Sequence, residues 1–413
     1  MSTETQAPES DELESNERFL ARLLGGDFLL WSPNIQAEGF LHWDKIFATR
    51  TIKKGATSVP YGVGETIDSV PFRAYDTDGD IDSLMRDDHL SGLLVIKNGE
   101  VRLEKYAKGL TPEGRWQSSS MVKSLAGILI GAAVHDGLID IENVVPFYLP
   151  DYAGTVYDTV TIRDLLTMTS GVDWSENTDD IHADVADHYI KVIAERKRGA
   201  IQEYQKTLKR ATESGSSYYY NTGDTFILSL ILSKVTGKTV SDYCSEKVWV
   251  PMGMEQDGFF MLDSDDGDEI IGSCCGASLR DYARWGTFMI NDGVAGGQRI
   301  VPEGWVTTAS TPQAANFAFD FAGERGVAGA ASDAHAGYGY FWWINPDGSY
   351  QALGSYGQWI HVDPANDLVV VMLGAIPRIP YMDPTMPEAG GENSHLGSER
   401  RGAFIGAVTE LLK

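Results

Sequence analysis

The sequence contains little cysteine, little positive charge and no long hydrophobic run. Its three cysteines, Cys244, Cys274 and Cys275, are too few and too unevenly spaced for a disulfide framework or a zinc site, so we expect buried free thiols. The 33 basic residues are outnumbered by 59 acidic ones, and the net charge of −26 argues against partners such as nucleic acid or an anionic membrane. Apolar stretches such as residues 368–376 have the length of a strand, so no transmembrane helix is predicted.

The acidic surplus has two interpretations, a surface that favours solubility or an adaptation to high salt. Residues 1–15 are polar and acidic, with neither the basic nor the apolar part of a signal peptide, which predicts a disordered tail and a cytoplasmic protein. The acidic loops at residues 76–80 and 263–269 do not place glycine at the sixth position of a calcium loop. There is no glycine-rich phosphate loop or histidine cluster either, so we expect no metal and no cofactor.

Strand-like patterns lie toward both ends of the chain, and the middle is mostly helical. Two of them, residues 91–97 and 100–106, surround Asn98-Gly99, a strong signal for a type I′ hairpin turn. Further strands are predicted at residues 338–344, 350–353, 358–362 and 368–373. Helical periodicity predicts helices that include residues 161–168, 225–235, 279–290 and 395–413.

This order predicts an α/β plus all-α architecture. An antiparallel sheet would be built from both chain ends and flanked by helices, with a helical domain inserted between the two ends. The corresponding boundaries are a tail at residues 1–15, an α/β domain formed by residues 16–137 and 335–413, and a mostly helical insertion at residues 138–334.

The most informative segment is a serine cluster that runs into an apolar helix. Ser120 and Lys123 are three residues apart, so they share one face of that helix. Because Lys123 lies within the apolar face, desolvation should lower the pKa of its amine and let it act as a base toward the Ser120 hydroxyl. The alternative is an N-cap serine with an exposed lysine.

Two later segments offer groups that would complete such a site. Residues 217–225 place three tyrosines before a helix, and one of them is a candidate proton relay; the alternative is that their rings pack on the core. In residues 351–364, Gly354 interrupts a strand pattern, which indicates a close approach by another backbone or by a ligand. The following N–H group would then be the second donor of an oxyanion hole, unless the glycine marks a β-bulge.

Taken together, these three segments resemble the serine β-lactamase and penicillin-binding-protein superfamily over roughly residues 60 to 410. The chain is most similar to the class C-like branch, which includes family VIII carboxylesterases and 6-aminohexanoate-dimer hydrolases. Residues 156–158 and 354–358 carry the local likeness to the latter group. The resemblance implies a β-lactamase/transpeptidase-like fold and a serine hydrolase in which Ser120 is acylated.

The resemblance also implies a role for each candidate residue. Lys123 would be the base, a tyrosine would relay protons, and the backbone N–H groups of Ser120 and Ser355 would form the oxyanion hole. The tyrosine is Tyr219 if the family's Tyr-x-Asn pattern ends at Asn221. Counting back from residues 235–237 gives Tyr220 instead, and we prefer that alignment. The predicted substrate-contacting residues are Tyr219, Trp174, Gly354, Tyr356 and Gln358.

The chain departs from the family at the Lys-Thr-Gly box. Its positions are occupied by Ala352, Leu353 and Gly354, so the lysine with which lactamases and peptidases hold a substrate carboxylate is missing. A Gly-x-Ser-x-Gly motif, typical of α/β-hydrolases, is also absent. We therefore expect a monomeric or homodimeric hydrolase of small esters or linear amides. The alternatives are a β-lactamase, a D-alanyl peptidase and a sensor that is acylated without turnover.

Overall fold

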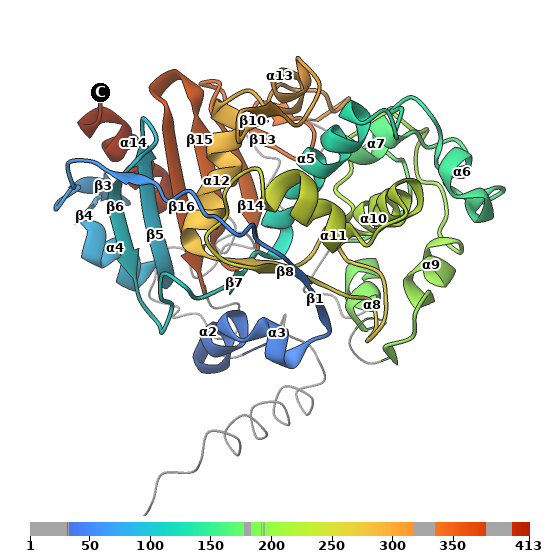
Figure 1. The fold of residues 1–413 in the computed structure, drawn as a ribbon, viewed down its shortest axis with the longest axis horizontal. Helices are drawn as coiled ribbons and strands as arrows, with labels where there is room; N and C mark the ends of the chain where they lie inside the picture. Colours follow the sequence, from blue (N-terminus) through green and yellow to red (C-terminus); the bar gives the residue numbers. More distant parts are fainter. Residues whose placement is uncertain are drawn as a thin grey trace, which may run out of the picture.

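The computed structural model describes residues 31, 33–176, 183–190, 192, 195–317, 335–376 and 399–413. Its main feature is an eight-stranded sheet in the order β12-β13-β14-β15-β16-β5-β6-β2 (Figure 1). The strands are β2 (Gly62–Val63), β5 (Leu90–Lys97), β6 (Glu100–Tyr106), β12 (Gly337–Tyr338), β13 (Trp343–Ile344), β14 (Tyr350–Gly354), β15 (Gln358–Asp363) and β16 (Leu368–Gly374). Because β16 pairs with β5, the two ends of the sequence form one sheet, as predicted.

The large sheet is mixed, since β2 runs parallel to β6 while the other neighbours are antiparallel. A second sheet has the order β1-β8-β9-β7, and two small hairpins complete the strands. These strands are β1 (Thr49–Ile52), β3 (Phe72–Ala74), β4 (Thr77–Gly79), β7 (Trp116–Gln117), β8 (Gly258–Met261), β9 (Cys275–Ala277), β10 (Val294–Ala295) and β11 (Gln298–Arg299).

The hairpin predicted at Asn98-Gly99 is confirmed. β5 and β6 pair on either side of it, and both turn residues have positive φ, as a type I′ turn requires. The strand predicted at residues 338–344 is wrong as a continuous element, because a turn with Phe341 at φ +63° separates β12 from β13. The aromatic side chains of that turn are buried, so their composition resembled that of a strand.

The predicted helices are found, with small changes at their ends, and residues 395–398 of the last one lie outside the described residues. The α-helices are α2 (Pro33–Leu41), α3 (Trp43–Ile46), α4 (Ile81–Asp87), α5 (Val122–His135), α6 (Val145–Tyr148), α7 (Ile162–Leu166), α8 (Asp184–Ile190), α9 (Ala200–Gln205), α10 (Thr222–Thr236), α11 (Val240–Cys244), α12 (Leu279–Ile290), α13 (Trp305–Ala309) and α14 (Glu399–Leu411). Short 3₁₀ turns occur at Ser119–Met121 (η2), Pro150–Tyr152 (η3) and Pro364–Asn366 (η6), and a π-helical turn, η5, spans Ser245–Trp249.

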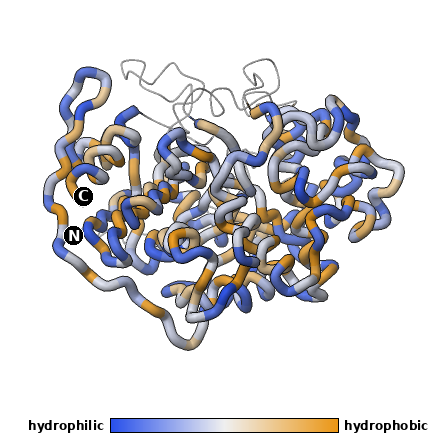
Figure 2. Tube along the Cα trace, turned by 90° about the horizontal axis from the view of Figure 1, so that it is seen from above, coloured by the Kyte–Doolittle hydropathy of each residue, from blue (hydrophilic) through white to orange (hydrophobic). Residues whose placement is uncertain are grey.

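Helix α5 lies between the large sheet and the helical part of the molecule (Figure 1). It packs against β14 on one side and against α10 on the other. Hydrophobic residues occur both in the part of the molecule built around the large sheet and in the helical part (Figure 2), and the buried ones form one continuous core. The N-terminus of α5 therefore stands where the sheet, α10 and the second sheet meet.

The predicted boundaries of the helical insertion stay a prediction. Helix α12 lies inside that range of sequence, yet it packs on β5, β15 and β16 of the large sheet. The tail predicted at residues 1–15 lies outside the described residues. In the part of the chain that the structure describes, no helix is both long and apolar enough to span a bilayer.

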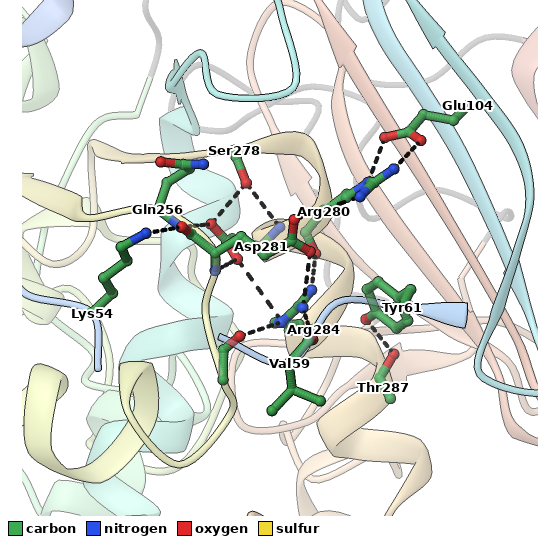
Figure 3. A network of polar contacts seen from close by, with 12 residues as sticks. Lys54, Val59, Tyr61, Glu104, Gln256, Ser278, Arg280, Asp281, Arg284 and Thr287 are labelled. Carbon is green, nitrogen blue, oxygen red and sulfur yellow. Dashed lines mark hydrogen bonds and ion pairs between the residues drawn. The ribbon is translucent and has the colours of Figure 1, made fainter. Parts of the chain in front are cut away.

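A buried polar network fixes the beginning of α12 (Figure 3). Asp281 accepts hydrogen bonds from the backbone N–H groups of Glu255 and Gln256 at 2.7 and 3.0 Å, and Arg284 contacts Glu255 at 3.0 Å. Arg280 makes a bidentate pair with Glu104 of β6. Because β9 leads directly into α12 and pairs with β7, the network also holds the strand that ends just before the serine cluster.

Candidate active site

Ser120 lies in the 3₁₀ turn η2, between the end of β7 and the start of α5. The sequence predicted that the α-helix begins at the serine cluster, but residues 119–121 form a 3₁₀ turn and the α-helix begins at Val122. Ser118 anchors the turn: its hydroxyl accepts from the Cys275 N–H at 3.0 Å, and its own N–H donates to the Cys275 carbonyl at 2.8 Å. Ser119 has φ +44°, an unusual value for a residue with a side chain, and its N–H donates to Gln117 at 2.6 Å.

The amine of Lys123 reaches Ser120 from the next turn of the helix. The Nζ atom lies 3.0 Å from the Ser120 Oγ, 3.0 Å from the Thr222 Oγ1 and 2.6 Å from the Gly272 carbonyl oxygen. The side chain is only 1% exposed. Burial lowers the pKa of Lys123 from 10.5 to about 8, and the negative charge of Glu176 partly opposes that shift.

Tyr220 precedes α10 and is brought to the same place. Its phenol makes a side-chain hydrogen bond with Ser120, and its ring centre lies 4.8 Å from the Lys123 Nζ. Burial raises the pKa of Tyr220 well above its usual value, so the phenol stays protonated over the range in which Lys123 titrates. The arrangement suits transfer of a proton through a neutral hydroxyl.

The geometry also bears on the choice between Tyr219 and Tyr220. Asn221 is the N-cap of α10, and its side chain accepts from the Asp224 N–H at 3.1 Å. It is the following residue, Thr222, that contacts Lys123. The alignment Tyr220-x-Thr222 therefore places a hydroxyl beside the lysine, whereas an alignment ending at Asn221 would place there a side chain that is already used as a cap.

Two partners of this site were not predicted, Glu176 and the carbonyl of Gly272. Glu176 is buried and accepts hydrogen bonds from the Thr222 hydroxyl, from the Thr222 N–H at 3.1 Å and from the Trp174 indole. Burial raises the pKa of Glu176, and Lys123 opposes that shift. A single glutamate in a chain with 59 acidic residues carries no signal, and a backbone carbonyl has no signature in the sequence.

The hairpin between β14 and β15 approaches the Ser120 turn closely. A Cβ atom on Gly354 would lie 2.3 Å from the Ser118 carbonyl oxygen, which accounts for a glycine at this position. Within the described residues, the backbone N–H groups of Ser120 and Ser355 donate no hydrogen bond. Two unpaired donors next to a nucleophile are what an oxyanion hole needs.

Gln358 supports the hairpin, and the substrate contact predicted for it stays a prediction. Its amide nitrogen donates to the carbonyls of Ser355 and Gly374 at 3.0 and 2.8 Å. Its amide oxygen accepts from the Trp116 indole at 3.0 Å and from the Gly374 N–H at 3.2 Å. The side chain is fully buried, and all four of its hydrogen-bonding positions are used within the protein in this structure.

Trp174 and Tyr356 are also buried rather than exposed to a ligand, each at 1% exposure. Trp174 packs over Gly223 of α10 and donates to Glu176, whereas the ring of Tyr356 lies 5.3 Å from that of Phe40 on α2. In this structure both rings pack in the core, and the substrate contacts predicted for them stay predictions. The contact predicted for Tyr219 stays a prediction.

All three cysteines are free and buried, as predicted. Cys274 follows the Gly272 carbonyl in sequence and lies near Lys123, and burial raises the pKa of its thiol. Among the described residues, no group of three histidine, cysteine or acidic side chains is arranged to hold a metal ion. The groups gathered around Ser120 are thus an amine, a phenol, a threonine hydroxyl and backbone donors, a set suited to acyl transfer.

Comparison with known proteins agrees with this chemistry. The sequence profile of the beta-lactamase family matches residues 77–378. A 6-aminohexanoate-dimer hydrolase of Paenarthrobacter ureafaciens is 28% identical over 304 residues, which is 72% of this chain and 76% of that protein. A putative 6-aminohexanoate-dimer hydrolase from Bacillus anthracis superposes with a TM-score of 0.75 at 20% identity, covering 92% of this chain and 94% of its own. A family VIII carboxylesterase superposes with a TM-score of 0.57 at 16% identity, covering 80% and 95%. The predicted β-lactamase/transpeptidase-like fold is confirmed.

Proposed function

The chain belongs to the beta-lactamase family of serine hydrolases, and from this premise we propose that it cleaves small carboxylic esters or linear amides through an acyl-enzyme on Ser120. The contact that carries the proposal is the 3.0 Å approach of the buried Lys123 amine to the Ser120 hydroxyl. An alcohol becomes a strong nucleophile only when a base accepts its proton, and a desolvated amine with a pKa of about 8 serves that purpose near neutral pH.

The proposed reaction has two halves. First, Lys123 accepts the Ser120 proton, the Ser120 oxygen bonds to the substrate carbonyl carbon, and the N–H groups of Ser120 and Ser355 stabilise the oxyanion. The proton then passes through Tyr220 to the leaving alcohol or amine as its bond to carbon breaks. In the second half, water attacks the ester carbonyl, the same groups accept its proton, and Ser120 regains its hydrogen as the acid departs.

Two features support small neutral acyl groups as substrates. Strand β14 carries alanine, leucine and glycine where a carboxylate-binding lysine would stand in lactamases and peptidases, and the net charge of −26 disfavours anions at low salt. The ring of Tyr220 stacks on that of Trp343 with ring centres 5.9 Å apart, and the rings of Trp343 and Tyr338 have centres 4.9 Å apart. An aromatic wall beside the nucleophile suits an apolar acyl chain. The name of the Paenarthrobacter relative adds linear amides to the substrates worth testing.

The test is a substrate panel run with the wild type and with Ser120→Ala. The panel contains short-chain p-nitrophenyl esters, the linear dimer of 6-aminohexanoate and a chromogenic cephalosporin. We expect ester hydrolysis by the wild type, little cephalosporin hydrolysis, and none of either by Ser120→Ala. The variant should stay folded, because a single hydroxyl at a helix start contributes only about 1 kcal/mol.

Two results would decide against the proposal. Efficient cephalosporin turnover with negligible ester turnover would identify a β-lactamase. A fluorophosphonate adduct on Ser120, seen by intact-mass spectrometry without turnover of any substrate in the panel, would identify an acylated sensor.

A further inference from the structure

A lysine amine that acts as a base must direct its lone pair at the group it deprotonates. Three oxygen atoms lie within hydrogen-bonding distance of the Lys123 Nζ, as many as a tetrahedral amine has positions for: the Ser120 Oγ, the Thr222 Oγ1 and the Gly272 carbonyl oxygen. When the amine is neutral, two of these positions hold N–H bonds and the third holds the lone pair. Which oxygen faces the lone pair depends on which of the three can offer a proton.

The hydrogen bonds of Glu176 determine whether the Thr222 hydroxyl can offer its proton to Lys123. One carboxylate oxygen, Oε2, accepts from the Trp174 indole and from the Thr222 N–H, which are groups that can only donate. The other, Oε1, receives the Thr222 hydroxyl. With its proton directed at Glu176, the Thr222 oxygen can only accept from Lys123. The Gly272 carbonyl has no proton to offer, so Ser120 is the one group that can donate to the lone pair.

We propose that Glu176 is a positioning residue that, through the Thr222 hydroxyl, aims the Lys123 lone pair at Ser120. This inference rests on the proposed serine-hydrolase function. It assigns Glu176 no contact with substrate and no part in bond making: the carboxylate acts by fixing the direction of one hydrogen bond. Its negative charge also stabilises the Lys123 ammonium.

Replacement by glutamine tests the direction of that hydrogen bond, because the surrounding donors dictate how the amide must lie. The Trp174 indole and the Thr222 N–H require an oxygen at the Oε2 position. The amide nitrogen is then forced to the Oε1 position and donates to the Thr222 hydroxyl. Thr222 would turn its own proton toward Lys123 and occupy the lone pair that Ser120 needs.

Other ionisable groups lie around this pair, so each variant must be compared with the wild type over the whole pH range. They are Tyr189 and His188 on α8, Tyr218, Tyr220 and Asp224 around the start of α10, Cys274 after Gly272, and Tyr338 on β12. Of these, Asp224 is the one that titrates near neutrality, since burial raises its pKa to about 7. It is present in every variant below, but the charge of Glu176 also raises the pKa of Asp224, so only the variants that keep Glu176 share its contribution unchanged.

The experiment measures the second-order rate of Ser120 labelling by a fluorophosphonate from acid to alkaline pH. We expect Glu176→Gln to lower the plateau rate at least about tenfold, since a misdirected base loses part of a contribution that runs to 10²–10⁴. The rate should rise with pH on the acidic side of the profile, and we call this rise the acidic limb. Loss of the carboxylate should move the midpoint of the acidic limb down by about one pH unit, because the Lys123 ammonium loses a stabilising charge. A purely structural loss would lower the rate at every pH and leave the limb in place.

Variants of Thr222 and a matched control complete the design. Thr222→Ser keeps the hydroxyl and should keep most of the rate, whereas Thr222→Val removes it and should lower the plateau. Adding Glu176→Gln to Thr222→Val should cost little more in plateau rate, because the link is already broken. Glu104→Gln removes another largely buried glutamate, paired with Arg280 in the network of Figure 3, and should leave the acidic limb unchanged. Far-UV circular dichroism and thermal unfolding establish that each variant folds.

The inference is overturned if Glu176→Gln folds and keeps both the wild-type midpoint of the acidic limb and the wild-type plateau rate. It is also overturned if the double variant loses as much plateau rate as Glu176→Gln and Thr222→Val lose separately. Should Glu176→Gln fail to fold, equal plateau rates for Thr222→Val and Thr222→Ser refute it. These outcomes leave the proposed function intact as long as wild-type Ser120 is labelled and turns over esters. Absence of labelling in the wild type would instead remove the proposed function, and this inference with it.

Discussion

Acyl transfer should depend on pH through the amine of Lys123. Burial lowers the pKa of this group from 10.5 to about 8, because the ammonium loses its hydration. Only the neutral amine accepts the Ser120 proton. With a pKa of about 8, roughly a tenth of the amine is neutral at pH 7 and roughly nine tenths at pH 9. The kcat/KM for an ester should therefore rise about tenfold per pH unit below pH 7 and level off near pH 9.

The assay is hydrolysis of p-nitrophenyl butyrate between about pH 5.5 and about pH 10, followed at a wavelength that is insensitive to ionisation of the nitrophenol. Ser120→Ala supplies the background rate at each pH. Lys123→Arg should be inactive throughout, since a guanidinium does not release its proton in this range. Because free-enzyme groups govern kcat/KM, its midpoint reports the amine before substrate binds.

Two profiles would refute this reasoning. A rate that still climbs about tenfold per unit beyond pH 9 would mean that the amine keeps the ordinary pKa of an exposed lysine. A rate that is flat from pH 6 to pH 9, or full activity in Lys123→Arg, would mean that Lys123 is not the base.

Three further predictions follow from the same contacts. Tyr220→Phe should lower kcat about 10²–10⁴-fold while Tyr219→Phe leaves it nearly unchanged, and the reverse order would favour the other alignment. Gly354→Ala should cost about 1–3 kcal/mol and most of the activity, because the new methyl group meets a backbone carbonyl, whereas Gly406→Ala, which meets nothing within 4 Å, should be neutral or stabilising in urea unfolding. Lys123→Met should raise the unfolding free energy by up to about 3 kcal/mol below pH 8, where the folded wild type carries the cost of a buried ammonium. This gain should fade between pH 8 and 10.5, because the lysine of the folded wild type is then neutral while that of the unfolded chain still binds its proton.

Features governed by neighbours in the sequence were predictable. The Asn98-Gly99 hairpin and helix α12, predicted at residues 279–290 and found there, follow from turn chemistry and periodicity. The pairing of Ser120 with Lys123 follows from helix geometry, because residues three apart meet whatever the rest of the fold does. The glycine at position 354 also indicated a close backbone approach before the partner was known.

Contacts between distant segments were decided by the tertiary structure. Glu176 meets Thr222 across 46 positions, and the Gly272 carbonyl meets Lys123 across 149. Neither leaves a mark on local periodicity or composition, because one is a single acidic side chain and the other is a backbone group. The burial of Trp174 and Gln358 was likewise not predictable, because aromatic and amide side chains suit a binding wall and a buried support equally well. The sequence by itself determined the family of folds, and it indicated the candidate nucleophile and its candidate base. Packing around α5 and α10 decided which oxygen atoms surround the amine, and with them the direction in which it can accept a proton.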